Sequence, residues 1–286
     1  MTSGDLLELF RDEMADQATP YLWGDDLVFG YINDAQNRFC RLTDGISDAT
    51  TAAVTQIAIA PAAQWYPYHS SITKLRQAYR ADTGAPVDII NQEDMPTRGW
   101  RFDGSTGPLR ALVLGIEAEQ LRAYPVPHDA TRLTAVSTDT AALGDVLVPV
   151  ASTAGLYVGM RVTGTGTDEY TTISALTATS VALSLPATAE IPSGTTLTFD
   201  LVVQLSVFRK PLVAITDDQA LEIPTEHQPH LLMWVKHRAY MKQDAETFDR
   251  TKAAEFKNDF EAYCFEVSQQ QGRSRHKPRA VAYGGI

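Results

Sequence analysis

A change of composition in the middle of the chain is the feature that most limits the folds open to this sequence. Residues 133–199 contain 15 Thr and only six charged residues, and no Lys, His, Trp or Cys. Short β-prone runs separated by Gly, Pro, Asp and Ser are typical of a small sandwich or barrel. We therefore expect an all-β domain at 133–199, inserted between an N-terminal part (1–132) and a C-terminal part (200–271). A tail follows at 272–286.

Four segments outside this insert have the apolar spacing of amphipathic helices. Apolar residues three or four positions apart predict helices over 3–17, 25–42, 229–243 and 249–271. The chain between 53 and 124 alternates and is interrupted by turn residues, which indicates short strands. The expected fold class is α+β: a helical body of about four main helices plus short strands, with an inserted sandwich- or barrel-like all-β domain.

The composition also limits the classes of function. The chain has 24 Lys and Arg against 35 Asp and Glu, a formal charge of −11. An acidic surface does not favour non-specific nucleic-acid binding, which needs clustered cations. No apolar run is long enough for a membrane-spanning helix, and the N-terminus lacks the cationic start of a signal peptide. Cys40 and Cys264 lie far apart in predicted helices, so we expect no disulfide, no membrane partner and synthesis in a reducing cytoplasm.

No pattern for catalysis or metal binding stands out. The sequence lacks a Gly-x-Ser-x-Gly elbow, a phosphate loop, a dinucleotide fingerprint and an EF-hand loop. Glu226, His227, His230 and His237 are close together, but no Cys pair lies nearby to complete a zinc site. Ordinary histidines on a helix surface are the simpler interpretation. We predict no catalytic residue, no metal, no cofactor and no enzymatic activity.

Two groups of residues are candidates for contacts with other proteins. Trp65, Tyr66 and Trp100 lie in aromatic-rich stretches, and aromatic residues are enriched at protein interfaces; packing in the core is the alternative. The tail contains no acid and four cations, which are Arg273, Arg275, Lys277 and Arg279. A cationic arm on an acidic body is either a docking arm or a disordered end.

Three parts of the sequence carry motifs that belong together. They are Leu6–Asp12 with a Trp-x-Asp corner at Trp23–Asp25 and Asn33–Gln36; Leu121–Pro127, which ends in Tyr-Pro-x-Pro; and Ile223–His227 with His237–Tyr240 and Asp244–Glu246. In this order and spacing they resemble the head-to-tail adaptor (connector) proteins of tailed bacteriophages. The resemblance covers most of residues 1–130 and 200–268. The insert at 133–199 departs from the pattern of that family.

The resemblance implies a structural protein of the virion. Such adaptors form a ring, commonly a dodecamer, between the portal and the tail, which links head to tail and frames the channel for DNA ejection. The implied partners are the portal protein, tail or nozzle proteins and further copies of the chain, with DNA passing without specific binding. The implied location is the head–tail interface, after assembly in the host cytoplasm. The four tail cations are then expected to dock onto the portal.

One alternative from a different class of function stays open. The Thr-rich domain at 133–199 is also compatible with a glycan- or surface-binding module that is carried on a helical structural protein.

Overall fold

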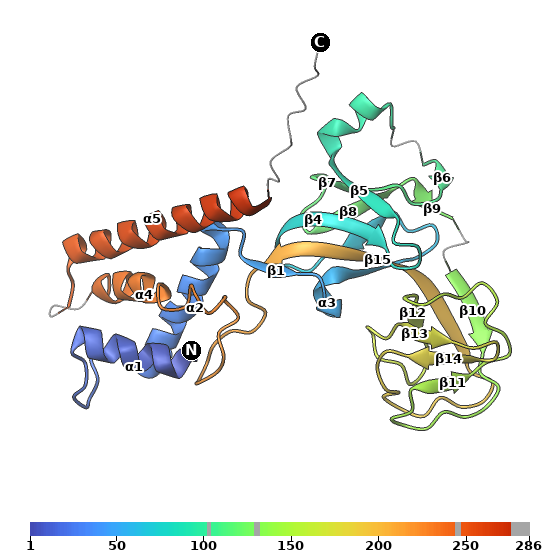
Figure 1. Ribbon diagram of the computed structural model, residues 1–286, viewed down its shortest axis with the longest axis horizontal. Coiled ribbons are helices and arrows are strands. Elements are labelled where there is room, and N and C mark those ends of the chain that lie inside the picture. The colour runs from blue at the N-terminus through green and yellow to red at the C-terminus, as the bar shows by residue number, and fades with distance from the viewer. Residues whose placement is uncertain (102–103, 129–131, 244–246, 276–286) are drawn as a thin grey trace, which may run out of the picture. The chain divides into compact units, whose positions relative to one another are not determined.

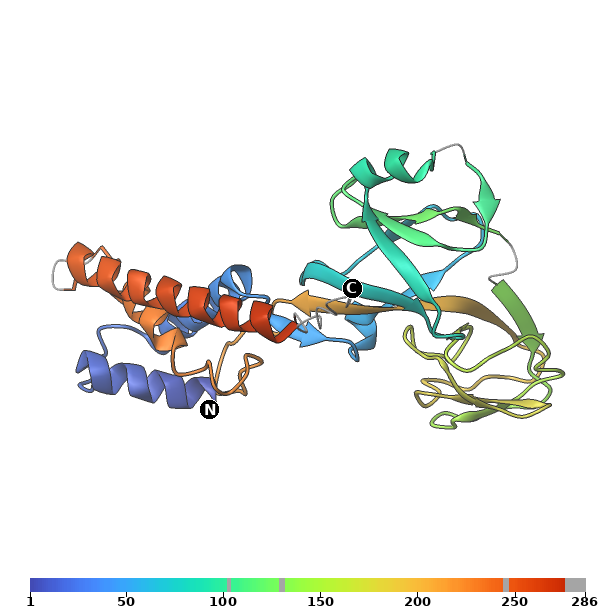
Figure 2. The ribbon, with the colours of Figure 1, turned by 45° about the horizontal axis from the view of Figure 1, so that its top comes forward.

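The computed structural model describes residues 1–101, 104–128, 132–243 and 247–275. The chain divides into two compact units (Figures 1 and 2). Met1–Ser47 and Phe208–Ile286 form the first, which we call the helical unit, and Asp48–Val207 form the second, which we call the sheet unit. The class is α+β, as expected.

In the described residues, four helices build the helical unit. They are α1 (Ser3–Met14), α2 (Asp25–Leu42), α4 (Leu231–Tyr240) and α5 (Arg250–Arg275). The first three lie within the ranges that apolar spacing predicts. The last helix was expected to end near Gln271 but continues to Arg275, because no Pro interrupts it and Gly272 alone does not end a helix of this length.

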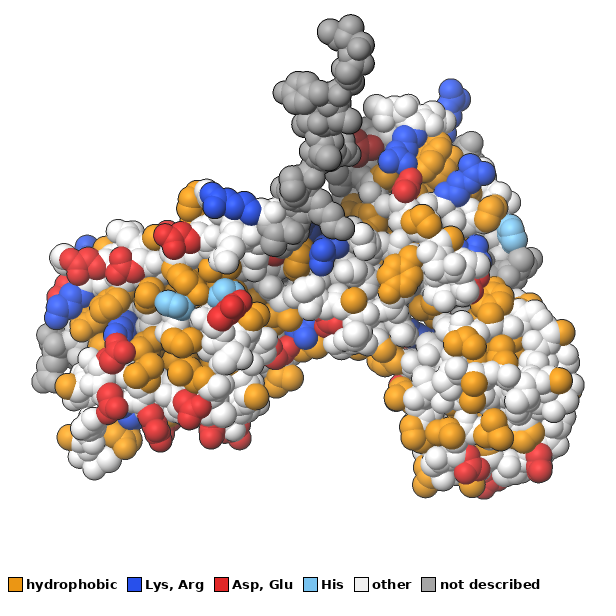
Figure 3. Space-filling view, in the orientation of Figure 1, with side chains coloured by type: hydrophobic (Ala, Val, Ile, Leu, Met, Phe, Trp, Pro, Cys, Tyr) orange, Lys and Arg blue, Asp and Glu red, His pale blue; other side chains and the backbone are white. Residues whose placement is uncertain are grey.

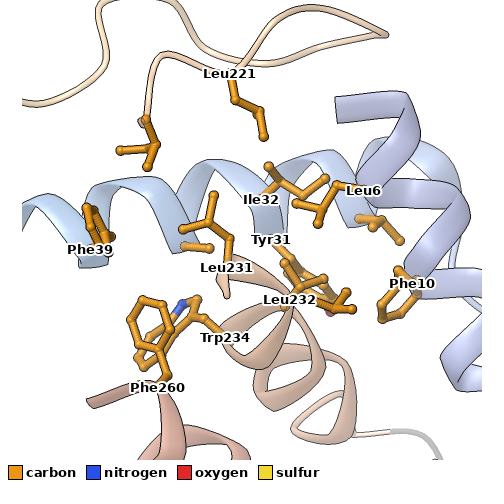
Figure 4. Close-up of a cluster of buried hydrophobic side chains, with 14 of the residues drawn as sticks. Leu6, Phe10, Tyr31, Ile32, Phe39, Leu221, Leu231, Leu232, Trp234 and Phe260 are labelled. Carbon is orange, nitrogen blue, oxygen red and sulfur yellow. The ribbon is translucent and has the colours of Figure 1, made fainter. Parts of the chain in front are cut away.

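The helices pack through one apolar core. Figure 4 shows Leu6 of α1 beside Ile32 of α2, Phe10 of α1 near Leu232 of α4, and Trp234 of α4 against Phe260 of α5. The Trp234 and Phe260 rings lie 5.3 Å apart. The apolar stripes seen in the sequence therefore face one another, and packing rather than helix propensity holds the unit together.

The Trp-x-Asp corner joins α1 to α2. The Trp23 ring packs edge-on against Phe10 at 5.5 Å. The Asp16 carboxylate accepts hydrogen bonds from the backbone N–H groups of Leu22 and Trp23, and it also binds the Arg11 guanidinium at 3.0 Å. Arg11 is buried, so these bonds satisfy a cation that would otherwise be costly to remove from water.

Short helices and many strands build the sheet unit; the strand at 46–48 begins, and the strand at 196–209 ends, in residues that belong to the helical unit. Their bounds are β1 (Ile46–Asp48), α3 (Ala52–Thr55), β2 (Gln56–Ile59), β3 (Trp65–Pro67), β4 (Ile72–Arg80), β5 (Pro86–Asn91), η1 (Gln92–Asp94), η2 (Pro96–Arg98), β6 (Thr106–Gly107), β7 (Ala111–Leu114), β8 (Gln120–Tyr124), β9 (Val126–Pro127), β10 (Arg132–Val136), β11 (Leu147–Pro149), β12 (Arg161–Thr163), β13 (Ile173–Leu176), β14 (Ser180–Leu183) and β15 (Thr196–Arg209).

Ten of these strands form one large curled sheet (Figure 2). Its order is β1-β15-β4-β5-β7-β8-β3, and β2, β10 and β12 also pair with β15. β5 and β7 pair in parallel, whereas β15 pairs antiparallel with β2, β10 and β12, as do β4 with β5, β7 with β8 and β3 with β8. The expectation of a helical body with minor strands is therefore not met for residues 48–132: local patterns identify the strand pieces, but their joining depends on long-range pairing that local patterns do not encode.

Residues 133–199 form strands, turns and loops and contain no helix. β11, β14 and β13 form a three-stranded sheet, while β10 and β12 pair with β15. Val148, Val162, Val181 and Ile191 are fully buried in its core. We refer to residues 133–199 as the insert.

β15 contributes to the core of the insert and to the core of the large sheet. Leu197 and Phe199 belong to the insert core, and Leu201, Val203 and Leu205 to the core of the large sheet. These residues alternate along the strand, so they share one face of it. β15 begins at Thr196, so the domain boundary that the sequence analysis places between residues 199 and 200 falls inside this strand.

An ion pair spans the two ends of the insert. Arg132 of β10 donates two bonds to the Asp200 carboxylate of β15, at 2.6 and 2.9 Å, and the two residues are directly opposite in the ladder. The Asp200 side chain is only 8% exposed. These bonds raise the pKa of Arg132 and compensate the burial of Asp200.

Replacing Phe199 by Ala tests the shared strand. The ring is fully buried, so F199A is expected to cost about 3–5 kcal/mol in the free energy of unfolding measured with urea. V213A is the control: Val213 is 62% exposed, and its truncation is expected to change stability by less than about 0.5 kcal/mol. Similar losses in both variants would contradict the packing described here.

Two Arg–Asp pairs of the sheet unit allow a matched test of the Arg132–Asp200 ion pair. R132A leaves a buried carboxylate without its charged partner and is expected to cost about 2 kcal/mol. R98A breaks the ion pair between Arg98 and Asp88, whose side chains are 42% and 53% exposed. Because the pair is exposed, its loss is expected to lower the free energy of unfolding by about 0.5 kcal/mol. Urea unfolding of both variants checks the difference, and equal costs would show that Asp200 does not depend on Arg132.

Candidate interaction surfaces

The four tail cations divide between the last helix and the chain beyond it. Arg273 lies in α5 and is exposed, and Arg275 is the last residue of that helix. Lys277 and Arg279 lie outside the described residues. A part of the basic stretch is thus an extension of α5, which would give a docking arm a helical base.

Tyr66 is a core residue of the sheet unit. Its side chain is almost fully covered, and its hydroxyl donates to the carbonyl oxygens of Ala60 (2.9 Å) and Ala63 (3.0 Å). Burial raises the pKa of Tyr66 to about 12. Because the ring is already enclosed by its own chain, it has little surface to offer a partner, and core packing is the role the structure gives it.

Trp65 and Trp100 are half-buried and carry cations on their rings. The Arg122 guanidinium lies 5.6 Å from the Trp65 ring centre, and Arg98 lies 5.3 Å from that of Trp100. Trp100 also stacks on Tyr124 with a centroid distance of 4.8 Å. Each tryptophan is thus held by contacts within its own chain.

The grouped histidines connect α4 to α5. His227 Nδ1 is 2.8 Å from the Tyr263 hydroxyl, and the His230 ring stacks on Tyr263 at 3.8 Å. His237 Nδ1 lies 2.9 Å from the Ala253 carbonyl oxygen. Because a carbonyl oxygen can only accept a hydrogen bond, the ring N–H is the donor. Within the described ranges, no group of three or more His, Cys, Asp or Glu could hold a metal ion. Helix packing accounts for these residues.

Both cysteines are buried and free. Burial raises the pKa of Cys40 and of Cys264 to about 12. A thiol with such a pKa is almost entirely protonated at neutral pH, and the thiolate is the reactive form. Neither residue therefore has the properties of a nucleophile.

The helical unit contains a cavity of about 380 Å³ beside α5, lined in part by Glu226, His227, Tyr263 and Glu266. Burial lowers the pKa of His227 in this cavity; the Glu226 carboxylate opposes the shift, and His230 adds a smaller lowering effect. In the part of the chain that the structure describes, no helix is both long and apolar enough to cross a membrane.

The insert exposes aliphatic side chains that sequence patterns did not single out. Leu143 is 71% exposed, Leu147 53%, Val146 49% and Leu185 39%. Figure 3 shows hydrophobic side chains over the end of the sheet unit that holds β11 and β14, with acidic ones among them. The run Val146–Val148 is a clear strand signal, but alternation does not reveal which face the chain leaves uncovered.

Residues 1–282 match the model of the SU10 adaptor protein family, and the chain belongs to that family. It is a family of phage adaptors, so the resemblance to phage adaptor proteins is confirmed at this level, and a structural role in the virion follows from the family. The matched span includes the insert. No curated protein matches the chain.

Two half-buried histidines predict an acid-sensitive helical unit. Burial lowers the pKa of His227 and of His237 below 6.5, so the unfolded chain binds protons more readily than the folded one. The stability that the two neutral histidines contribute is fully present above pH 6.5 and is lost as the pH falls below that value. The free energy of unfolding is expected to be lower at pH 5.5 than at pH 7.5, and H227Q/H237Q to reduce that difference. The variant H69Q, at an exposed histidine, is the control and leaves the difference unchanged.

Proposed function

We propose that this phage adaptor forms a ring between the portal and the tail, links head to tail and frames the channel through which DNA leaves. The observation that carries the proposal is the family match, which spans nearly the whole chain from residue 1 to residue 282. The order of the Trp-x-Asp, Tyr-Pro-x-Pro and Ile-Pro-Thr-Glu-His motifs supports the head-to-tail position. We further propose a dodecamer that is assembled in the host cytoplasm and has the portal and tail or nozzle proteins as partners.

The chemistry of the described residues agrees with a structural role. The candidates for catalysis, which are the histidines and the two cysteines, are used in packing. Polar groups pair within the chain rather than converging on a reaction centre. We infer that the protein acts by contact with other proteins.

The charge of the chain is suited to a channel that does not retain DNA. At −11 each, twelve copies would carry −132. DNA-binding affinity depends on cations that displace the counterions of the phosphates. A strongly acidic assembly repels the phosphate backbone, so DNA can pass without specific binding.

We propose that the basic end of the chain is the portal-docking element. Arg273 is exposed on α5, and the cations continue in sequence to Arg279 without an intervening acid. Trp65 and Trp100 are the aromatic candidates for contacts in the same assembly. We do not propose Tyr66 as a contact residue, because its own chain covers its side chain.

No observation favours the glycan-binding alternative. The aromatic residues of the insert are Tyr157, Tyr170 and Phe199, of which Phe199 is buried and the others are half-buried. The large apolar side chains that the insert exposes are aliphatic. Aliphatic side chains do not provide the flat surface on which a sugar ring stacks against an aromatic ring.

Co-assembly with purified portal tests this proposal. The wild-type chain is expected to give portal-bound rings of twelve copies in negative-stain images. Deletion of 272–286, or replacement of its four cations by Gln, is expected to abolish binding because the arm loses its charge-assisted bonds. The control replaces four cations elsewhere by Gln, namely Arg110, Arg250, Lys252 and Lys257, and retains binding. Unchanged binding after the deletion would remove the docking role, and the absence of rings with the wild-type chain would remove the ring.

A further inference from the structure

Two polar residues of α2 lie against one long loop of the helical unit, which spans residues 210–222. The Asn33 side chain donates to the Ile215 carbonyl oxygen and accepts from the Ile215 N–H, each at 2.8 Å. Gln36 follows three residues later, on the same face of the helix, and is 1% exposed. Asn33 therefore fixes the loop to the part of α2 that carries Gln36.

Further hydrogen bonds hold this loop in one shape. The Glu222 carboxylate at its end accepts from the backbone N–H groups of Leu212 and Val213 at its start, at 2.7 and 3.1 Å. In between, the Ser3 hydroxyl of α1 donates to the Asp217 carbonyl oxygen at 2.7 Å. The loop is thus ordered before any ligand binds, so binding against it costs little conformational entropy.

A cavity of about 270 Å³ lies between this loop and α2, and we call it the Gln36 pocket. Its lining consists of Gln36, Val213, Ile215, Gln219, Ala220 and Glu222. The volume is just below the range of about 300–1,000 Å³ that holds drug-sized ligands, and it is many times the share of about 30 Å³ that one water molecule has in the liquid. The size is suited to a single large side chain.

The side-chain oxygen of Gln36 determines which chemistry fits the pocket. This Oε1 atom is buried and has no hydrogen-bond partner among the residues that the structure describes. A buried acceptor without a donor is costly, and such groups are rare in folded proteins. The Glu222 carboxylate, by contrast, already binds the Arg209 guanidinium, so the pocket does not need a cation. The fitting occupant is neutral and apolar, with one N–H or O–H donor.

The sequence after α5 contains a side chain of this kind. Eleven residues follow Arg275, and among them Tyr283 alone joins a neutral ring to a hydroxyl donor. Its neighbours, Ala282 and Gly284, are small. The ring can therefore enter a pocket without bulky side chains on either side of it.

The segment after α5 is long enough to bring this ring to the pocket. The Asp44 N–H, just beyond α2, donates to the Gln271 side chain at 3.2 Å, so the ends of α2 and α5 adjoin (Figure 1). Gln36 lies about 9 Å of helix before the end of α2. The eight residues from Arg275 to Tyr283 extend to about 26 Å, which is enough for the path back past Gln271 and along α2.

We propose that the Tyr283 ring occupies the Gln36 pocket of its own chain, where its hydroxyl donates to Gln36 Oε1. The ring exchanges water for the apolar walls of the pocket, and the hydroxyl supplies the donor that the buried oxygen lacks. The same chain is the source of the occupant because the adjoining helix ends place the segment within reach. The inference does not rest on the proposed ring, because the pocket and the segment belong to one chain.

The contact tethers the basic end of the chain at two points. Arg275 belongs to α5, and Tyr283 lies in the pocket, so Lys277 and Arg279 are part of a short closed loop beside the helical unit. A partner that takes up this basic segment in an extended form must first displace the ring. The contact is therefore autoinhibitory toward such a partner.

Disulfide formation in the purified full-length chain tests the contact. In V213C/G284C, one cysteine lines the pocket and the other follows Tyr283. In a glutathione redox buffer, its intrachain disulfide is expected to form about tenfold faster than that of Q269C/G284C, because the bound ring raises the effective concentration of one thiol near the other.

Q269C/G284C is a matched control. Gln269 is exposed on α5 and is nearer to residue 284 in sequence than Val213 is, so a segment without a preferred contact would link to it at least as fast. Equal rates in the two variants would overturn the inference. A disulfide between two chains in V213C/G284C, in place of one within a chain, would also overturn it, because the occupant would then come from a second copy.

Changes to the tyrosine separate the ring from its hydroxyl. In the V213C/G284C background, Y283A is expected to lower the rate to that of the control. Y283F keeps the ring but removes the donor, and it is expected to lower the rate several-fold, as is Q36L, which removes the acceptor. An unchanged rate with Y283A would mean that the pocket holds water only, and an unchanged rate with Y283F would contradict the bond to Gln36. The two tail variants keep the test valid if Q36L disturbs packing.

Small molecules provide an independent measurement of the pocket chemistry. p-Cresol has the ring and hydroxyl of tyrosine, so it is expected to slow disulfide formation in V213C/G284C and not in Q269C/G284C. Toluene at the same concentration lacks the donor and is expected to slow it less; equal effects would contradict the bond to Gln36. The native Cys40 and Cys264 do not interfere, since both are buried and their thiols have a pKa of about 12.

Discussion

The packing of β15 is the interaction on which most of the sheet unit depends. Alternate residues from Leu197 to Val207 enter two hydrophobic cores in succession, while the backbone of the same strand pairs with β2, β10 and β12. The insert is therefore not attached by a flexible linker at its C-terminal end. Arg132 and Asp200 fix its other end against the same strand. A domain inserted in this way can transmit load to the sheet that carries it.

The distribution of polar groups explains why an adaptor role fits better than a reactive one. His227, His230 and Tyr263 join α4 to α5, Trp234 donates to the Asp34 carboxylate at 2.8 Å, and both cysteines are enclosed. These groups serve the packing of one chain, and what remains on the surface is suited to contact: exposed leucines, half-buried tryptophans and an exposed arginine at the end of α5.

Local sequence patterns predicted some parts of the structure and not others. The spacing of Leu6 and Phe10, and of Tyr31, Ala35 and Phe39, predicts α1 and α2 because helical periodicity is a local property. The composition of 133–199 identified the β insert for the same reason. The pairing of β5 with β7, and the joining of ten strands, depends on contacts between distant segments. Tyr66 and Trp65 are adjacent and chemically alike, yet opposite strand faces make one a core residue and leave the other half-buried.

The scarcity of cations in the insert has a consequence outside assembly. Trypsin-like proteases cleave after Lys or Arg, and residues 133–199 contain no Lys and one Arg. That residue, Arg161, lies in β12 with its side chain covered. The insert thus presents no accessible Lys or Arg bond to such enzymes in the folded state, so limited trypsin digestion should leave it intact while exposed sites elsewhere are cut.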